Sequence, residues 1–433
     1  MTCRGQTYDN ASAMSGIYNG LQAKVLEVNG VATWIPCTAH SLNLVGKNAA
    51  ECCRSAVNFF DFLEKLYVFF TNSTRRHQVL TDVLKASDAS LTLKRVTTTR
   101  WSCRADATKA LKLGYHQIKG ALQQISDDVE EKACVRCEAE GLVTRLNQLE
   151  TGIYTVFWND ILQRVDATNR SLQSTKLDLN TAVATLTSLK DFVSSKRDSF
   201  EGYEREGEEL CGSSVYVEST TRQKRRSVRL EAVDYGHGEE TQFNPSLRFK
   251  VERFLPVIDQ FTASLHQRLQ AYELLAGRFG CFGCLSTLSP EELTTAAKTL
   301  IGTYPDDLDH SFADELCHFA KFADIFKDDE PSGNISTEQF LYKLIINKGV
   351  QDTFPNVAIA LRMYLVLMVT NCSAERSFSK LKLIENRLRT SMTQARLVNL
   401  AIMSTESDIL REIDFTDIIS DFAAAKSRKV SGL

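Results

Sequence analysis

The chain has 433 residues, of which 43% are apolar and 24% charged, and its 51 basic and 54 acidic residues give a formal net charge of −3. This composition excludes a disordered or collagen-like chain. The near-neutral charge excludes a protein that binds nucleic acid through its overall charge alone. At roughly 150 residues per domain, we expect about three domains, or fewer if one carries a long insertion.

The cysteines and the apolar runs indicate the compartment. Twelve cysteines, including the adjacent pair Cys52 and Cys53, are scattered along a chain that starts with polar residues. We therefore expect free thiols in a reducing compartment. The longest apolar run, 357–369, is interrupted by Arg362 and is shorter than the roughly 20 residues that a membrane span needs. We predict no transmembrane helix and no membrane partner.

The first hundred residues combine short strands with helices. Residues 1–20 read as a strand followed by a Gly, Asn and Ser-rich turn region. The segment 31–36, Val-Ala-Thr-Trp-Ile-Pro, is β-branched and aromatic, which predicts a short buried strand that ends at Cys37. From residue 39 to about 84, apolar residues recur at three- and four-residue spacing, which predicts amphipathic helices. The expected fold class is α/β, mostly helical.

The middle of the chain is predicted to be helical. The same periodicity continues over about 104–127 and 130–198. Residues 198–245, which are rich in Glu and Gly and include the basic run 222–226, are predicted to form an exposed loop and to be the best linker candidate. Helices resume at Leu247 and continue to the apolar block that ends at Val369.

Two amphipathic helices are predicted after this block. Ser373 can cap the first, and Thr393 can cap the second. The apolar face of the first helix is made by Phe378, Leu381, Ile384 and Leu388. The second helix would turn Leu397, Leu400 and Ala401 inward. Such a stripe needs a partner surface, so we expect self-association through it.

Two carboxylates stand at the predicted ends of elements. Asp9 follows the first strand, and Glu375 lies in the first turn of a helix. Carboxylates that converge from such ends can hold divalent cations, which activate water and stabilise the leaving oxygen of a phosphodiester. Asp before Asn-Ala is also a common turn former, and a first-turn Glu also compensates the helix dipole. The pattern by itself leaves both interpretations open.

Several cysteines have the spacing of metal ligands. Cys37 and His40 lie one helical turn apart, but a closed zinc site needs four ligands. The pairs 134/137 and 281/284 lie far apart in the chain. Inert or structural cysteine is the favoured interpretation of each pair.

Arg100 and Trp101 place a cation next to a flat ring. Such a pair can hold a phosphate and stack on an unpaired base. A half-buried Trp beside a solvated Arg is the simpler interpretation. The basic run 222–226 can likewise be a solvated loop, a phosphate contact or a nuclear-localisation signal.

Four motifs, taken in order, carry a family resemblance. They are Cys-Arg-Gly-Gln-Thr-Tyr-Asp-Asn-Ala-Ser from residue 3, Ile-Pro-Cys-Thr-Ala-His-Ser-Leu-Asn-Leu from 35, Thr-Arg-Trp from 99 and Asn-Cys-Ser-Ala-Glu-Arg-Ser-Phe from 371. The set resembles the hAT superfamily of DNA transposases, and most of all its domesticated relatives of the zinc finger MYM-type and THAP-type repressor-like groups. The resemblance covers about 1–105 and 350–405.

The resemblance implies a ribonuclease H-like core that a large all-α insertion interrupts. Residues 1–101 would form the N-terminal part of an incomplete core, with its first strands missing. The insertion would occupy 102–345 and include the loop 198–245. Residues 346–410 would supply the C-terminal helices of the core and the hAT dimerisation region, and 411–433 would be a tail.

The resemblance also implies roles for single residues. In active relatives an Asp-Asp-Glu triad binds Mg²⁺ for strand cleavage and joining. Asp9 matches the second Asp and Glu375 the Glu, whereas the first Asp would lie upstream of Met1. Cys37 and His40 match the family's Cys-x-x-His near the active site. Arg100 and Trp101 match residues that steady a flipped base.

The expected function follows from these matches. We expect a hAT transposase-derived nuclear protein that dimerises and contacts DNA, without nuclease activity of its own because two carboxylates do not readily hold both cations. The alternatives are a truncated form of an active transposase that uses Mg-dependent Asp-Asp-Glu chemistry, and a helical protein-interaction scaffold. No small-molecule substrate and no cofactor is expected, and Mg²⁺ only if missing sequence completes the triad. A nuclear location follows from the family and the basic run 222–226.

Overall fold

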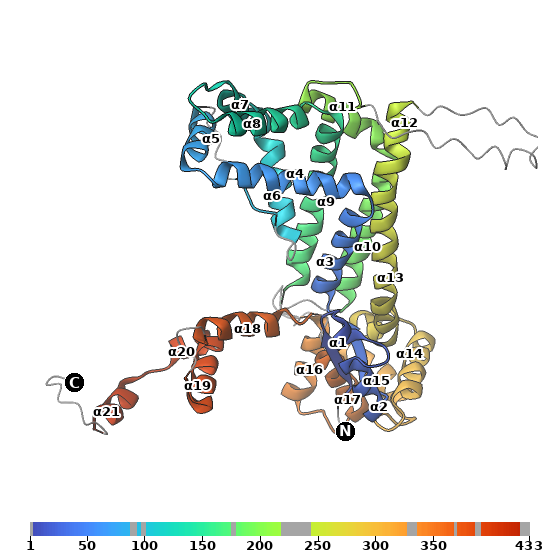
Figure 1. The fold of residues 1–433 in the computed structure, drawn as a ribbon. Coiled ribbons are helices and arrows are strands. Elements are labelled where there is room, and N and C mark those ends of the chain that lie inside the picture. Colours follow the sequence, from blue (N-terminus) through green and yellow to red (C-terminus); the bar gives the residue numbers. More distant parts are fainter. Residues whose placement is uncertain are drawn as a thin grey trace, which may run out of the picture. The chain divides into compact units, whose positions relative to one another are not determined.

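The computed structural model describes residues 3–86, 93–96, 101–174, 179–217, 244–326, 336–367, 370–385 and 391–424. The chain divides into two compact units, Met1–Thr370 and Asn371–Leu433. Helices make up most of the described chain, as predicted (Figure 1). The sheet in the described part is small, because it consists of two strands.

The two strands form a parallel pair at the start of the first unit. β1 (Gly5–Tyr8) runs beside β2 (Thr33–Pro36), and the register pairs Gly5 with Thr33 and Tyr8 with Pro36. Parallel strands need a crossover, which α1 (Ser12–Ser15) and α2 (Leu21–Val28) supply. The buried side chain of Gln6 donates its Nε2 hydrogens to backbone carbonyl oxygens that flank the pair, 3.3 and 2.9 Å away. The predicted strands on either side of the turn region are confirmed.

Long helices follow, and their positions confirm the predicted periodicity. The first group is α3 (Thr38–Glu51), α4 (Arg54–Thr71), α5 (Thr74–Ala86), α6 (Trp101–Leu113) and α7 (Tyr115–Asp127). The second group is α8 (Ala133–Leu146), α9 (Leu149–Leu172), α10 (Leu179–Ser195) and the short turn η1 (Lys196–Asp198). α9 buries residues on all sides, which is typical of a helix at the centre of a helical domain.

The prediction of a loop over 198–245 is wrong for about its first third, where the chain forms a helix. α11 (Phe200–Cys211) packs on α9 and buries Phe200, Tyr203 and Cys211 at helical spacing. The dense glutamates on its exposed face obscured this apolar stripe. Gly207 allows the close contact, because a Cβ atom there would lie 2.6 Å from the backbone nitrogen of Ile153. The basic run 222–226 lies outside the described residues.

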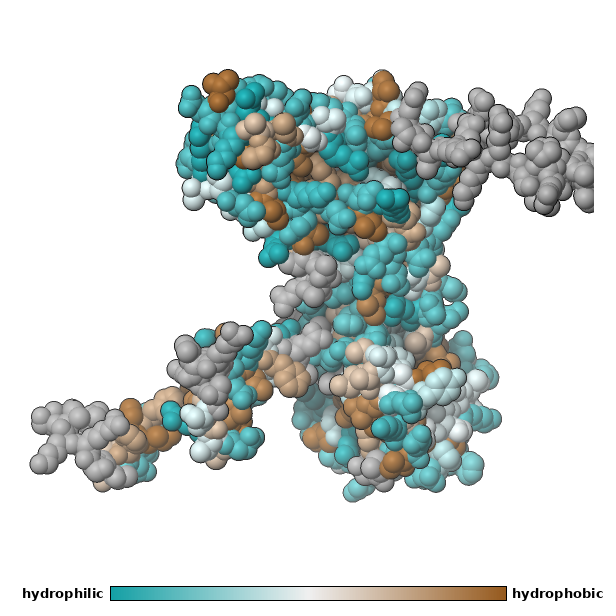
Figure 2. Space-filling model, in the orientation of Figure 1, coloured by the Kyte–Doolittle hydropathy of each residue, from teal (hydrophilic) through white to brown (hydrophobic). Residues whose placement is uncertain are grey.

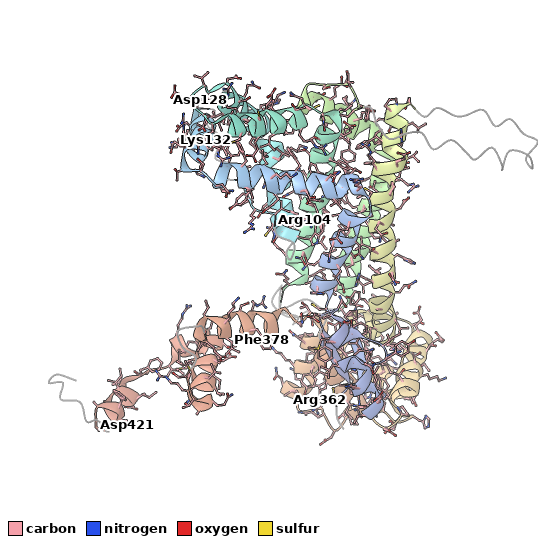
Figure 3. All side chains as sticks on the ribbon, in the orientation of Figure 1. Arg104, Asp128, Lys132, Arg362, Phe378 and Asp421 are labelled. Atoms are coloured by element: carbon pink, nitrogen blue, oxygen red, sulfur yellow. The ribbon has the colours of Figure 1, made fainter. Side chains whose placement is uncertain are left out.

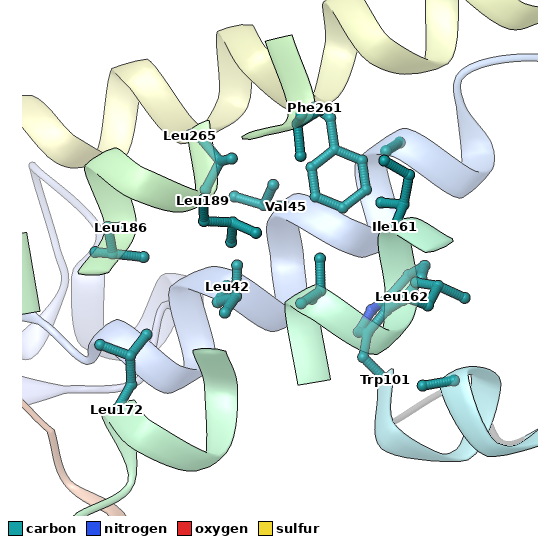
Figure 4. Packing of buried hydrophobic residues seen from close by; sticks show 14 of the residues in the cluster. Leu42, Val45, Trp101, Ile161, Leu162, Leu172, Leu186, Leu189, Phe261 and Leu265 are labelled. Atoms are coloured by element: carbon teal, nitrogen blue, oxygen red, sulfur yellow. The ribbon is translucent and has the colours of Figure 1, made fainter. Parts of the chain in front are cut away.

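The chain then returns along the same core. α12 (Pro245–Phe249), the π-helical turn η3 (Lys250–Phe254) and α13 (Leu255–Phe279) form one continuous rod (Figure 1). α13 packs on α10 and α3. Figure 4 shows side chains of these helices meeting, with Phe261 and Leu265 of α13 near Val45 of α3 and Leu189 of α10. This apolar core holds the first unit together.

Shorter helices complete the first unit. They are η4 (Gly280–Cys284), α14 (Pro290–Thr303), α15 (Phe312–Asp324), α16 (Thr337–Lys348) and α17 (Pro355–Val366). The predicted apolar block is α17, whose apolar residues contribute to the core. In the described chain, no helix combines the length and the apolar character that crossing a bilayer requires.

The second unit contains four described helices. They are α18 (Cys372–Ile384), α19 (Gln394–Thr405), α20 (Ser407–Glu412) and α21 (Thr416–Ala424). The predicted cap of α19 is confirmed, since the Thr393 side chain accepts a hydrogen bond from the Arg396 backbone nitrogen at 3.4 Å. The prediction that Ser373 caps α18 is wrong. That helix begins at Cys372, so Asn371 is the residue at the cap position.

Candidate functional site

The second unit exposes a large apolar surface. None of its residues whose burial is described is buried. Its exposed large apolar side chains, which we call the α18–α21 surface, are Phe378, Leu383, Val398, Ile402, Met403, Ile409, Ile413, Phe415, Ile418, Ile419 and Phe422. Figure 2 shows apolar residues on the surface of this unit, and Figure 3 shows Phe378 on α18. Apolar patches of this kind mark sites where a protein meets a partner.

Contacts between α18 and α19 fix the local shape of this surface. Lys380 donates from Nζ to the backbone carbonyl oxygens of Ser404 at 2.7 Å and Thr405 at 3.3 Å. A cation at the last carbonyls of a helix also compensates the helix dipole. The two helices therefore form a hairpin in which Lys380, within α18, holds the C-terminal end of α19.

The predicted dimerisation residues have different environments. Phe378 is 70% exposed. Leu381 and Ile384 are half-buried in the hairpin, and Leu388 lies outside the described residues. Sequence reasoning missed Leu383, which is 78% exposed, because it falls off the stripe of three- and four-residue spacing.

The surface extends past α19 into α21. Phe415, Ile418, Ile419 and Phe422 are exposed and have the i, i+3, i+4, i+7 spacing of one helix face. Asp414 holds the start of the helix, because its carboxylate accepts from the Thr416 backbone nitrogen at 3.0 Å. The Thr416 hydroxyl also donates to Asp414, at 2.6 Å, and this bond and the backbone bond keep the pKa of Asp414 below its usual value. Sequence reasoning assigned this segment only to a tail, although the spacing is visible in it.

Asp9, the predicted metal ligand, lies directly after β1. Its Oδ1 accepts from the Ala11 backbone nitrogen at 3.1 Å, which is the geometry of an Asx turn. The next residue, Asn10, donates from Nδ2 to the Ser41 hydroxyl of α3 at 3.0 Å and so anchors the turn. Glu375 lies in the first turn of α18, in the other unit, and its side chain lies outside the described residues. The pairing of these two carboxylates stays a prediction.

Cys37 and His40 flank the start of α3. Cys37 is buried, and its backbone N–H donates to the Tyr8 carbonyl oxygen at 3.1 Å, which continues the strand pairing. Its Sγ lies 3.6 Å from the Thr370 hydroxyl. His40 is half-buried in the first helical turn. Over the described ranges, no group of three His, Cys, Asp or Glu side chains converges as metal ligands would.

Trp101 lies in the core at the start of α6. Its ring is 4% exposed, the Arg104 guanidinium carbon lies 4.5 Å from the ring centroid, and a Cβ atom on Gly46 would lie 2.7 Å from the ring. Phe60 contacts it edge-on at 6.1 Å between centroids. Arg100 lies outside the described residues. The role of this pair toward nucleic acid stays a prediction, and stacking on a base would require the indole to leave this packing.

Comparison with known proteins identifies the C-terminal region. Residues 315–409 match the family described as the hAT family C-terminal dimerisation region. The chain carries a hAT dimerisation region. This match confirms the predicted resemblance to the hAT superfamily.

A second comparison covers almost the whole chain. The human 52 kDa repressor of the inhibitor of the protein kinase is 21% identical over 430 residues, which cover 95% of this chain and 54% of that protein. The chain therefore spans about half the length of this curated relative.

The hAT dimerisation region includes parts of both units. Its first residue, Glu315 on α15, accepts hydrogen bonds from the Val357 backbone nitrogen at 2.7 Å and the Asn356 side chain at 2.8 Å. These bonds satisfy donors at the start of α17. Burial raises the pKa of Glu315 above its usual value. The part of the region in the first unit is thus built into a packed core, and the part in the second unit carries the exposed apolar side chains from Phe378 to Ile409.

Proposed function

We propose that this hAT-derived protein functions as a homodimer, and that the α18–α21 surface forms the interface with the second copy. The observation that carries the proposal is the absence of any buried residue in the described part of a unit with so many large apolar side chains. The family match supports a second copy of the chain as the occupant, because the part of this surface from Phe378 to Ile409 lies inside the dimerisation region.

The energetics favour a covered surface. Helices as short as those of the second unit are marginal in water unless they bury an apolar face. Burying one Leu, Ile or Phe side chain is worth about 1.5–3 kcal/mol. Several such side chains from each copy would therefore stabilise both the helices and the dimer.

Light scattering after size-exclusion chromatography tests the proposal. The wild-type chain should elute at twice the mass of one chain at tens of micromolar. The double variant Phe378→Asp, Ile402→Asp should elute at the mass of one chain, because two buried carboxylates would oppose the interface. The matched control is Leu274→Asp, which places the same charge on an exposed apolar position of α13.

Two results would contradict the proposal. The first is a wild-type chain that stays folded and monomeric at tens of micromolar. The second is a double variant that dimerises as strongly as the Leu274→Asp control. Circular dichroism of all three proteins distinguishes a lost interface from a lost fold.

The finer part of the proposal concerns ancestry and location. We propose that β1, β2 and their crossover are a remnant of a ribonuclease H-like core, that the protein acts in the nucleus with local contacts to DNA, and that this polypeptide by itself does not cleave DNA. The parallel strands with Asp9 directly after β1 support the ancestry. The word repressor in the name of the human relative supports the location.

A cleavage assay separates this proposal from its alternatives. The chain is incubated with labelled duplex DNA and Mg²⁺ or Mn²⁺, beside the Asp9→Asn variant. We expect no cleavage above the variant's background. Metal-dependent cleavage that Asp9→Asn abolishes would instead establish an active transposase, and a protein that neither cleaves nor binds DNA would favour the helical interaction scaffold.

A further inference from the structure

A cavity of about 430 Å³ lies in the first unit. The starts of α4 and α9, the end of α8 and the π-helical turn η3 form its wall. The residues that matter for its chemistry are Cys53, Ser55, Arg145, Glu150, Tyr154 and Arg253. Single π-helical turns inside longer helices occur often at functional sites.

Cys53 sits at the N-terminal end of α4, an 18-residue helix. Its Sγ lies 3.4 Å from the Ser55 hydroxyl and 4.0 Å from the Tyr154 hydroxyl, which lie 2.7 Å from each other. The positive end of a helix and nearby hydroxyl donors stabilise a thiolate at this position. The carbonyl oxygen of Arg253, 3.9 Å from the sulfur, accepts from the thiol form.

The neighbouring thiol sets the ionisation of the pair. A hydrogen bond from Cys52 lowers the pKa of Cys53, and further bonds from Ser55, the Ala56 backbone and Tyr154 lower it as well, against the opposing effect of burial. The same hydrogen bond raises the pKa of Cys52. Cys53 is therefore the nucleophile of the pair, and Cys52 keeps its proton.

The cavity has positive charge that the protein compensates poorly. Arg253 lies 3.6 Å from Glu150, and Glu252 at the rim pairs with Arg248 at 3.0 Å. The Nη1 of Arg145 donates at 3.0 Å to the neutral side chain of Gln148. Burial lowers the pKa of Arg145, because its charge loses water, and the nearby Glu150 carboxylate offsets only part of this effect. An anion in the cavity would restore this balance.

Two buried polar atoms at the cavity have no hydrogen-bond partner. They are Oε2 of Glu150, whose side chain is 11% exposed, and Oγ1 of Thr151, a residue that is 2% exposed. Buried polar atoms in proteins are nearly always paired. These two therefore point to a polar occupant that donates hydrogen bonds to them.

We propose that Cys53 is a modification site that takes up a thiol from a small disulfide bearing both carboxylate and amino or amide groups. The Cys53 thiolate attacks one sulfur of the disulfide, the new S–S bond forms as the old one breaks, and the other half leaves as a thiolate that takes a proton from water. The carboxylates of the added group lie toward Arg145, and its N–H groups toward Glu150.

The first test measures alkylation by iodoacetamide at each cysteine of the full-length protein by peptide mass spectrometry. For a free thiol the rate rises about 50-fold between pH 6.5 and 8.5, following the thiolate fraction. We expect less than a fivefold rise at Cys53, and a steeper rise at Cys53 in Ser55→Ala. Cys134 and Cys137, both exposed on α8, are internal references. A rise at Cys53 equal to that of the references would overturn the proposal.

The second test measures anion preference. The ratio of alkylation by iodoacetate to that by iodoacetamide should be at least about threefold higher at Cys53 than at Cys134, because positive charge concentrates anions locally. Arg145→Gln should bring the ratio to that of Cys134, whereas Arg75→Gln, an exposed arginine of α5, should leave it unchanged. Equal ratios at the two cysteines in the wild-type protein would refute an anion-binding cavity.

The third test uses oxidised glutathione, which has the proposed chemistry. Incubation near pH 7 should place one glutathione on Cys53 before any other cysteine, and Cys53→Ser should abolish this fast phase while circular dichroism stays unchanged. Cystamine, a cationic disulfide, should react several-fold more slowly. First modification at another cysteine, or a faster reaction with cystamine, would contradict the proposal.

Discussion

Gly207 shows how a single residue can set the distance between two helices. A Cβ atom there would lie within 3 Å of the Ile153 backbone, and one on Gly152 would lie 2.3 Å from the Gly207 carbonyl oxygen. Both contacts are with backbone atoms, which a rotamer change cannot relieve. α11 can therefore pack on α9 at this distance only because these two positions lack side chains.

Gly207→Ala should lower the free energy of unfolding by about 2 kcal/mol or more, the typical cost of overpacking a core. Gly202→Ala on the same helix is the matched control, because a Cβ atom there meets nothing within 4 Å. The control should gain about 0.4–1 kcal/mol from the lower entropy of its unfolded chain. Urea unfolding followed by circular dichroism measures both, and equal effects would contradict the close contact.

Residue types alone could predict some roles of single residues but not their surroundings. Asp9 directly follows a strand, as its position in the sequence predicts. The residue pattern favours a half-buried Trp101 as the simpler interpretation, and the family resemblance implies a role beside a flipped base. Its ring packs on Gly46 and Phe60. These contacts join residues tens of positions apart, so no local pattern contains them.

Among the elements, α14 has the clearest start signal. The Ser289 hydroxyl accepts from the Glu292 backbone nitrogen at 3.3 Å, and the Glu292 carboxylate accepts from the Ser289 backbone nitrogen at 2.8 Å. This reciprocal capping box satisfies two donors at the helix end. Helix positions with such local signals are the ones that sequence predicts best.

Ser289→Ala should lower the free energy of unfolding by about 1 kcal/mol, because it leaves one of these donors without its partner. Thr295→Ala, at an exposed position inside the same helix, should be neutral or slightly stabilising, since Ala is the better helix former. Thermal unfolding of the two variants compares the effects. A loss at Thr295 equal to that at Ser289 would show that the box does not cap the helix.

The same box should make stability depend on pH in a defined direction. The hydrogen bond from the Ser289 backbone lowers the pKa of Glu292. A carboxyl with a lowered folded-state pKa stabilises the fold above its unfolded-state pKa, and the contribution is lost as the pH falls through the folded-state value. The stability difference between wild type and Glu292→Ala should therefore shrink as the pH falls below about 4.3. A difference independent of pH would contradict this role.

α11 and α21 show why some elements escape sequence reasoning. In α11, the glutamates on the exposed face make the average hydropathy of the segment polar, although four positions of the helix are buried. In α21, an apolar face lies in an acidic segment near the C-terminal end of the chain, where a tail is the simplest assumption. Both helices have the 3.6-residue spacing, so a search for periodicity without regard to overall polarity would have found them.

At the scale of the whole molecule, the order of motifs was more informative than composition. Four short motifs predicted the hAT resemblance, and the match over 315–409 confirms it. The helical middle of the chain could be predicted only as helical, because helix packing depends on contacts far apart in sequence. The reactive pair Cys52 and Cys53 is visible in the sequence, but its cavity requires η3 and the starts of α4 and α9 to come together.

In the proposed dimer a second copy covers the α18–α21 surface, and hydrogen exchange at two protein concentrations tests this most directly. In an obligatory interface, amides of these helices should exchange slowly at tens of micromolar and much faster after dilution to the nanomolar range, because protection requires the dimer. Amides of α9, in the core of the first unit, should show no such change. Protection of α18–α21 that is the same at both concentrations, or absent at both, would contradict the account.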